Sequence, residues 1–201
     1  MGKLLADITP LKESPAFRPA LMPAIGAVMI GGGESTVGIL LASTAVGAFL
    51  AGLFSGPLGR VRWQGSAVVW SVMGWGASIA GFGVVVLLAG RTDDSGVTVW
   101  LVPAALCCAL AGIADSISAV FRHTILQAAT PDHLRGRLQG VFIVVVAGGP
   151  RVGDLMAGAG TKILNEGWVL LLGGILCIAV AWLAAQLQPG FRKYDAHNPV
   201  P

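Results

Sequence analysis

Four charged residues stand inside apolar stretches of this sequence, and they are the first candidates for chemistry. Asp115 and Arg122 are seven residues apart, so they lie about two turns from each other on one face of a helix. Arg151 and Asp154 have the i, i+3 spacing that lets two side chains meet on a helix surface. A charge at the centre of a bilayer costs about 2.5–3.5 kcal/mol on insertion scales. Each pair therefore requires a structural or a functional reason.

Two interpretations of the first pair remain open. In the functional one, Asp115 is a protonatable group in a proton-coupled transport cycle, as intramembrane carboxyls often are. In the structural one, Asp115 is a tether to Arg122, to a neighbouring loop or to helix ends, while Arg122 snorkels towards the membrane surface. We favour the tether, because intramembrane ion pairs often join structural elements. Asp115 nevertheless remains the best single candidate for a protonatable site.

The second pair follows a helix-breaking signal. Pro150 removes a backbone donor and tends to kink a helix, and the two glycines before it add freedom. This pattern is typical of a helix that bends near a substrate pathway, which would make Arg151 and Asp154 transport or coupling residues. Equally, the pair can neutralise itself while the small residues around it pack against a partner helix. The sequence favours neither interpretation.

The composition places these charges in a membrane. The chain of 201 residues is 55% hydrophobic and only 11% charged, with a mean hydropathy of +0.77, whereas soluble domains carry about 25% charged residues. The 29 glycines suit helices that approach closely through small residues. The net charge of +3 is spread in ones and twos at the ends of apolar runs. This distribution of charge therefore indicates how the chain is oriented in a membrane rather than a surface that binds nucleic acid. We predict an all-α integral membrane protein in contact with the lipid bilayer.

Apolar runs long enough to span a bilayer as helices define the domain organisation. Five are predicted as transmembrane helices: Thr36–Leu58, Ser66–Leu88, Val97–Phe121, Leu138–Ile163, which is interrupted at Gly148–Pro150, and Gly167–Leu187. Residues 20–33 form a short, doubtful sixth helix. A polar segment, 1–19, precedes the membrane bundle, 20–188, and a tail, 189–201, follows it. Small residues at Ala48, Gly52 and Gly56 predict that the first long helix approaches another closely.

Basic residues at the ends of these runs predict the orientation, because cytoplasmic loops collect Lys and Arg. One side receives Arg60, Arg62, Arg122, Arg135, Arg137, Arg192 and Lys193, and the other receives Arg91 and Lys162. The C-terminus is therefore predicted to be cytoplasmic, and a crossing by residues 20–33 would place both ends there, which the charge bias mildly favours. Arg60, Arg62, Arg135 and Arg137 are further candidates for structural or gating latches to carboxylates or to helix C-termini.

Enzymatic and metal-binding signatures are missing from the sequence. The three cysteines lie in apolar runs without a CxxC pair, and the three histidines are far apart. Neither a nucleophile elbow, an HExxH motif nor a phosphate-binding loop occurs. We therefore predict no enzyme activity, no metal, no cofactor and no ATP-driven pumping, which leaves secondary transport or a non-catalytic membrane role.

Several motifs carry a family resemblance. GPLGRVR, residues 56–62, resembles the loop motif of the major facilitator superfamily: Gly52, Gly59 and Arg60 match it, whereas Gly56 and Pro57 replace its acidic and first basic residues. TPDHLRGRLQG (130–140), AGGPRVGDLMAG (147–158) and GFRKYD (190–195) follow the first charged pair. Together these motifs resemble the C-terminal half of bacterial enterobactin-exporter-like major facilitator transporters, over roughly residues 20–195.

The resemblance implies a fold and a function. The predicted spans would correspond to helices eight to twelve of twelve, with residues 20–33 as a remnant of the seventh, and the N-terminal six-helix half would be missing. It implies proton-linked efflux of an unidentified small molecule across the bacterial inner membrane, by alternating access with a second half. That half would come from another chain or from a second copy of this one. The alternative is a truncated, non-transporting membrane protein or a helix-bundle interaction module.

Overall fold

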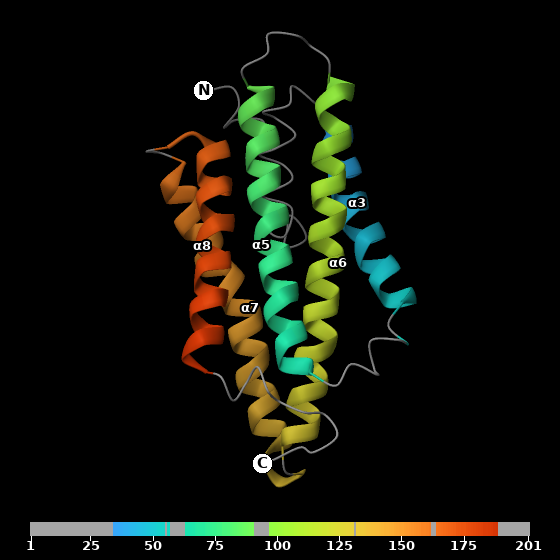
Figure 1. The fold of residues 1–201 in the computed structure, drawn as a ribbon, viewed down its shortest axis with the longest axis vertical. Helices are drawn as coiled ribbons and strands as arrows, with labels where there is room; N and C mark the ends of the chain where they lie inside the picture. Colours follow the sequence, from blue (N-terminus) through green and yellow to red (C-terminus); the bar gives the residue numbers. More distant parts are fainter. Residues whose placement is uncertain are drawn as a thin grey trace.

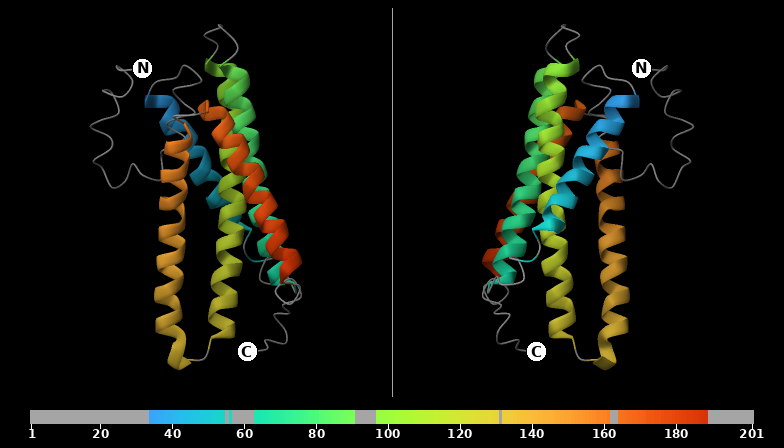
Figure 2. Two further views of the ribbon diagram at one scale, coloured as in Figure 1. Left: turned by 90° about the vertical axis from the view of Figure 1, so that its left-hand side faces the viewer. Right: turned by 90° about the vertical axis from the view of Figure 1, so that its right-hand side faces the viewer.

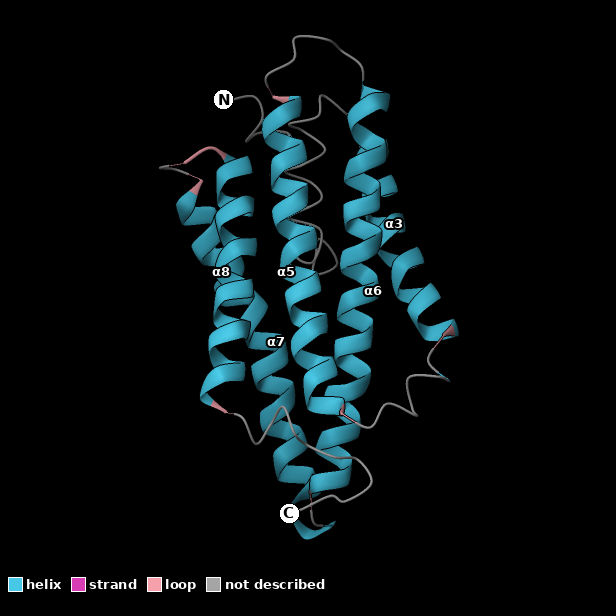
Figure 3. Ribbon diagram, in the orientation of Figure 1, coloured by secondary structure: helices cyan, strands magenta, loops and turns pink. Residues whose placement is uncertain are grey.

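In the computed structural model, the residues described are 34–54, 56, 63–90, 97–130, 132–161 and 164–188, and they form helices and short turns (Figures 1 and 3). The elements are α3 (Glu34–Leu53), α5 (Gln64–Ala89), α6 (Val97–Ala129), the short 3-10 helix η2 (Asp132–Leu134), α7 (Arg135–Gly160) and α8 (Glu166–Leu187). Each of the five α-helices is long and apolar enough to cross a membrane. The predicted all-α bundle with five spans is therefore confirmed. The doubtful sixth helix, 20–33, lies outside the described residues.

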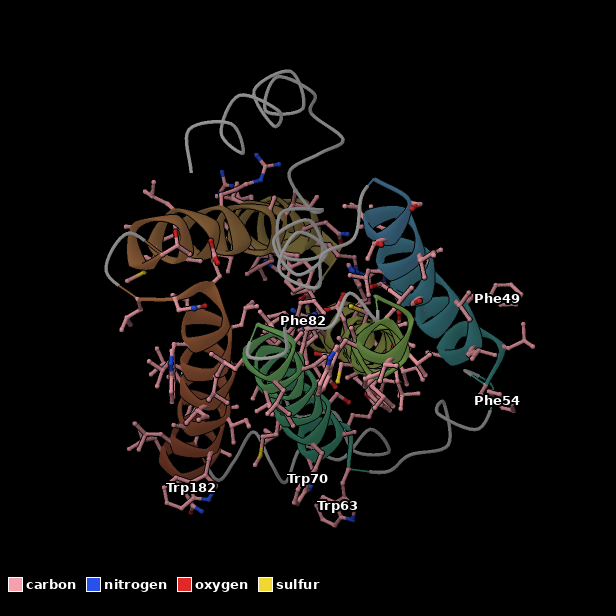
Figure 4. All side chains as sticks on the ribbon, turned by 90° about the horizontal axis from the view of Figure 1, so that it is seen from above. Phe49, Phe54, Trp63, Trp70, Phe82 and Trp182 are labelled. Atoms are coloured by element: carbon pink, nitrogen blue, oxygen red, sulfur yellow. The ribbon has the colours of Figure 1, made fainter. Side chains whose placement is uncertain are left out.

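Four of the helices form a row. α5 packs along α8 on one side and along α6 on the other, and α3 crosses the opposite side of α6 (Figure 4). The core lies where these helices meet, and its buried members include Leu40 from α3, Phe82 and Val86 from α5, Ala104 from α6 and Leu170 from α8. The row is therefore held by side-chain burial between α3, α5, α6 and α8.

Glycines set the closest approaches in this row. A Cβ atom added at Gly47 in α3 would overlap the Ala109 carbonyl of α6, and one at Gly112 would overlap the Thr44 carbonyl. Gly52 has nothing within 4 Å of such an atom. The predicted close approach of this helix therefore occurs at Gly47 and at Ala48, whose backbone nitrogen would lie 3.2 Å from a Cβ at Gly112, but not at Gly52 or Gly56.

Helix α6 continues beyond the predicted span. We expected it to end at Phe121, but it runs to Ala129, and its 33 residues extend over about 50 Å, against about 30 Å for the hydrocarbon core. The sequence passes from apolar to polar after Phe121, yet no helix-breaking residue occurs before Thr130-Pro131. The Thr130 hydroxyl donates to the Leu126 carbonyl at 2.5 Å and closes the last turn. The predicted span ended at the change in polarity, whereas the helix continues to Ala129, just before the Thr130-Pro131 sequence.

Helix α7 is also more regular than predicted. The helix is continuous from Arg135 to Gly160, so the interruption predicted at Gly148–Pro150 is wrong. A proline removes one helical hydrogen bond, and membrane helices tolerate this loss where small neighbouring residues let the backbone adjust. Gly148 and Gly149, which precede Pro150, are the small residues that allow this adjustment.

Helix α7 stands apart from the row. It contacts η2 and α8 near its two ends, and the apolar window of its span has no buried residue. Its exposed large apolar residues include Val141, Ile143, Val144, Val145, Val152, Leu155 and Met156. Figure 2 shows α6 and α7 joined at the end that bears η2 and separate above it. An apolar helix is thus left largely unpartnered by the described residues.

Candidate functional site

The structure brings the first predicted pair together. A guanidinium nitrogen, Nη2, of Arg122 lies 3.5 Å from Oδ1 of Asp115. The Nε–H of Arg122 also donates to the Ser118 carbonyl oxygen at 3.2 Å. The seven-residue spacing therefore produces one polar face on α6, with Arg122 folded back along its own helix.

The two partners differ in exposure. The side chain of Asp115 is 66% exposed and that of Arg122 is 33% exposed, so the carboxylate faces away from the packed row. Between them, Ser118 is buried, with 2% exposure, and its Oγ has no hydrogen-bond partner within the described structure. The polar face of α6 is therefore incomplete: one hydroxyl is unsatisfied, and the carboxylate is covered on one side only.

The second pair lies at a similar depth on the neighbouring helix. Asp115 is fourteen residues before the end of α6 and Arg151 sixteen residues after the start of α7, which places them about 21 Å and about 24 Å from the turn that joins the helices. The Arg151 side chain is exposed. The side chains of Asp154 and Pro150 are outside the described structure, so the pairing of Arg151 with Asp154 stays a prediction. Oppositely charged side chains thus stand at one level on two helices that diverge from a common turn.

The basic residues of that turn are partly placed. Nη2 of Arg135 donates to the Gln127 carbonyl at 3.3 Å, in the last turn of α6, where a cation complements the helix dipole. Arg137 is exposed. Arg60 and Arg62 lie outside the described residues. The Arg135 contact has the geometry of the predicted latch, and its gating role stays a prediction.

Sequence reasoning missed one contact between α6 and α7. The rings of His123 and Phe142 pack edge to face, with centroids 5.0 Å apart and an interplanar angle of 68°. The predicted span ended at Phe121, which would leave His123 beyond the helix. Because α6 continues past Phe121, His123 instead projects from a regular helix that runs beside α7. The contact was therefore missed because the predicted helix ended too early.

The described residues hold no group of three His, Cys, Asp or Glu side chains that could bind a metal. Cys107, Cys108 and Cys177 are free thiols. Charge pairs and apolar helix faces are thus the chemical features that the described helices offer.

Apolar helices of spanning length, with charges at mid-depth, define a multi-pass α-helical membrane protein. The chain is 26% identical over 165 residues to the enterobactin exporter EntS of Citrobacter koseri, a match that covers 82% of this chain and 36% of the relative. EntS of Salmonella paratyphi A matches with 26% identity over 164 residues and the same coverage. EntS of Escherichia coli O81 matches with 26% identity over 151 residues, or 72% of this chain and 33% of the relative.

These matches confirm the resemblance that the sequence motifs carry: the chain is similar to a fragment of enterobactin exporters of the major facilitator type. The chain spans about a third of the length of the curated relatives it matches. Neither a family model nor a solved structure matches it. The relatives are transporters and not enzymes.

Proposed function

We propose that this chain is one half of a secondary active transporter that exports a small molecule by alternating access with a second half. The observation that carries the proposal is the incomplete polar face of α6. A carboxylate that is 66% exposed in a membrane-spanning helix requires water or protein on its exposed side, because lipid does not solvate it. A central pathway between two halves supplies both.

The same face supports proton coupling. While Asp115 is ionised it holds the Arg122 guanidinium at 3.5 Å; a protonated, neutral carboxyl attracts that cation much less. Each proton that binds or leaves therefore changes the charge balance of one face of α6. Arg151, at a similar depth on α7, offers a second cation to the carboxylate that remains when a proton leaves, or to an anionic substrate.

A second half is the partner that fits the uncovered surface. Lipid chains can cover the apolar side chains of α7, but they leave the exposed carboxylate of Asp115 unsatisfied. The relatives are about three times as long as the matched segment, which agrees with a transporter built from this chain and a second half. That half would be another polypeptide or a symmetric copy, and the complex would lie in the bacterial inner membrane with the C-terminus of this chain in the cytoplasm.

The test is efflux from cells that express the chain with its candidate second half, using radiolabelled enterobactin, the cargo named for the relatives. Asp115→Asn and Arg151→Ala are each expected to abolish efflux driven by a proton gradient, with membrane abundance unchanged. The matched control, Asp93→Asn, makes the same chemical change in the connection between α5 and α6 and should leave efflux intact. Full efflux by both variants would remove the two residues from the mechanism.

A non-transporting membrane module is the second candidate, and the contact of Arg135 with the Gln127 carbonyl in the last turn of α6, which has the geometry of a structural latch, favours it. Under this alternative the charged pairs only hold helices together. The same substitutions then lower abundance or oligomer formation, and no flux is measurable with any variant. Six further apolar segments encoded upstream of Met1 or in an adjacent gene would favour the transporter, and their absence from that DNA would favour the module.

A further inference from the structure

Two kinds of helix contact hold the row together, and in the first kind the backbones themselves touch. A Cβ atom added at Gly76 in α5 would lie 2.9 Å from the Gly174 carbonyl oxygen of α8, and one at Gly174 would lie 2.5 Å from the Gly76 carbonyl oxygen. Further along α5, a Cβ at Gly83 would lie 2.5 Å from the backbone nitrogen of Leu171. These distances leave no room for a side chain. Glycines therefore interlock α5 and α8 over about two helical turns.

Helices α3 and α6 interlock in the same way where they cross. The Cβ added at Gly47 meets the Ala109 carbonyl oxygen, and the one added at Gly112 meets the Thr44 carbonyl oxygen. The contact is reciprocal, because each helix presents a glycine to the backbone of the other. The two helices therefore cannot slide at this crossing without first moving apart.

The contact between α5 and α6, here called the α5–α6 joint, has side chains at the corresponding places. A Cβ at Gly74 would lie 3.8 Å from the Cβ of Ala114, and a Cβ at Gly81 would lie 3.4 Å from Sγ of Cys107. Both glycines of α5 thus face side chains of α6 and not its backbone. Helices that meet through side chains can shift past each other by small amounts, which interlocked backbones resist.

The buried core connects the two sides of this joint at one end. Phe82 and Val86, late in α5, belong to the same buried cluster as Ala104 and Cys108, early in α6. Gly74 and Ala114 lie nearer the end where α5 begins, and both are only partly buried. Other residues near that end are also buried, namely Val68 and Phe121, but they lie outside the cluster. The shared core therefore holds α5 to α6 away from the end where α5 begins.

We propose that the row moves as two bodies, α5 with α8 and α3 with α6, which pivot about the core at Phe82 and Val86. The α5–α6 joint then opens and closes at the end where α5 begins. Asp115 directly follows Ala114, so the movement displaces the Asp115–Arg122 face together with α6. The proposal rests on the helix contacts and holds whether or not the chain transports anything.

Spin-label distances in the full chain, reconstituted in lipid nanodiscs, test this division. The three native cysteines are replaced by alanine, and exposed positions are changed to cysteine in pairs and labelled. Trp70→Cys with Val120→Cys spans the joint towards the end where α5 begins, and it should give two distance populations. Leu88→Cys with Val102→Cys spans the joint at the core end and should give one narrow population.

Two further label pairs lie within the proposed bodies. Trp70→Cys with Leu183→Cys joins α5 to α8, and Phe49→Cys with Val120→Cys joins α3 to α6; all four positions are exposed. Each pair should give one narrow population, because the backbones of its two helices are interlocked. These pairs share a label position with the pair that spans the opening end, so they control for motion of the labels themselves.

A matched pair of variants links the two populations to the joint. Gly74→Ala places a methyl group 3.8 Å from the Cβ of Ala114, which adds a contact without a clash. It should shift the ratio of the two populations about fourfold towards the shorter distance, the change that one buried methyl group gives. Gly173→Ala adds the same group to α8 with nothing within 4 Å, and it should leave the ratio unchanged. Circular dichroism confirms the helix content of both variants.

Two outcomes would overturn the proposal. A single narrow population for Trp70→Cys with Val120→Cys, unchanged by Gly74→Ala, means that the row is one rigid body. Two populations within α5–α8 or within α3–α6 mean that the glycine contacts do not hold those helices together as pairs.

Discussion

Asp115 and Arg122 form an ion pair whose contribution to stability depends on the groups that surround it. An exposed pair in water contributes only about 0.2–1 kcal/mol, so the contact itself is a weak source of stability. Removing one partner of the pair inside a membrane costs more stability than this, because it leaves the other charge uncompensated. Arg122 has a long side chain near the end of the apolar stretch and can reach the surface alone, whereas Asp115 is short and deeper. The two residues should therefore not be equivalent.

This asymmetry gives a prediction at the residue scale. Arg122→Ala should lower the abundance of the protein in the membrane, because it strands Asp115 at a cost of up to about 2.5–3.5 kcal/mol. Asp115→Asn should leave abundance near the wild-type level. The double variant Asp115→Asn, Arg122→Ala should recover most of the loss, since no unpaired charge remains. Quantitative immunoblotting of membrane fractions measures all three, and undiminished abundance of Arg122→Ala would mean that water or another group already compensates Asp115.

At the scale of elements, the sequence predicted the helices well and their contacts poorly. Five apolar runs give five helices because each polar backbone group must be satisfied inside a bilayer, which leaves few alternatives to a helix. The choice between Gly47 and Gly52 as the contact could not be predicted, since small residues recur on more than one face of α3. The extension of α6 was missed for a related reason: polarity marks where a membrane ends, whereas Pro131 marks where this helix ends.

Gly47 and Gly52 form a matched pair for testing the helix row. Gly47→Ala places a Cβ against the Ala109 backbone and should destabilise the α3–α6 contact by about 1–3 kcal/mol, the usual cost of overpacking. Gly52→Ala meets open space and should be neutral or stabilising by up to about 0.5–1 kcal/mol, because alanine favours a helix over glycine. Thermal unfolding in detergent compares the two. Equal effects would show that α3 does not pack on α6 as described.

For the whole molecule, the helix directions and the charge pattern lead to one orientation. Adjacent helices in sequence run antiparallel (Figure 1), so the α6–α7 turn lies at the end where α5 begins and α8 finishes. Arg135 and Arg137 lie at this end, and the sequence has further basic residues just before α5 and just after α8, so we propose that this end faces the cytoplasm. The candidate site follows from the sequence only in part, since spacing predicts the Asp115–Arg122 contact but not the exposure of its carboxylate, which depends on how the helices pack around α6.

Cysteine labelling tests this orientation directly. In a chain whose three native cysteines are replaced by alanine, Asp93→Cys, in the connection between α5 and α6, should react with a membrane-impermeant maleimide added to intact cells. His133→Cys, which is exposed in η2, should react only after permeabilisation, because the positive-inside rule places that turn in the cytoplasm. A position in the apolar middle of α7, Val144→Cys, controls for reagent that enters the bilayer. The reverse pattern would place the basic turn and the C-terminus outside, and labelling of both loops in intact cells would mean that the chain inserts in two orientations. Dual insertion would also supply an inverted second copy as a partner for the exposed face of α7, which makes the labelling result informative about the proposed second half as well as about topology.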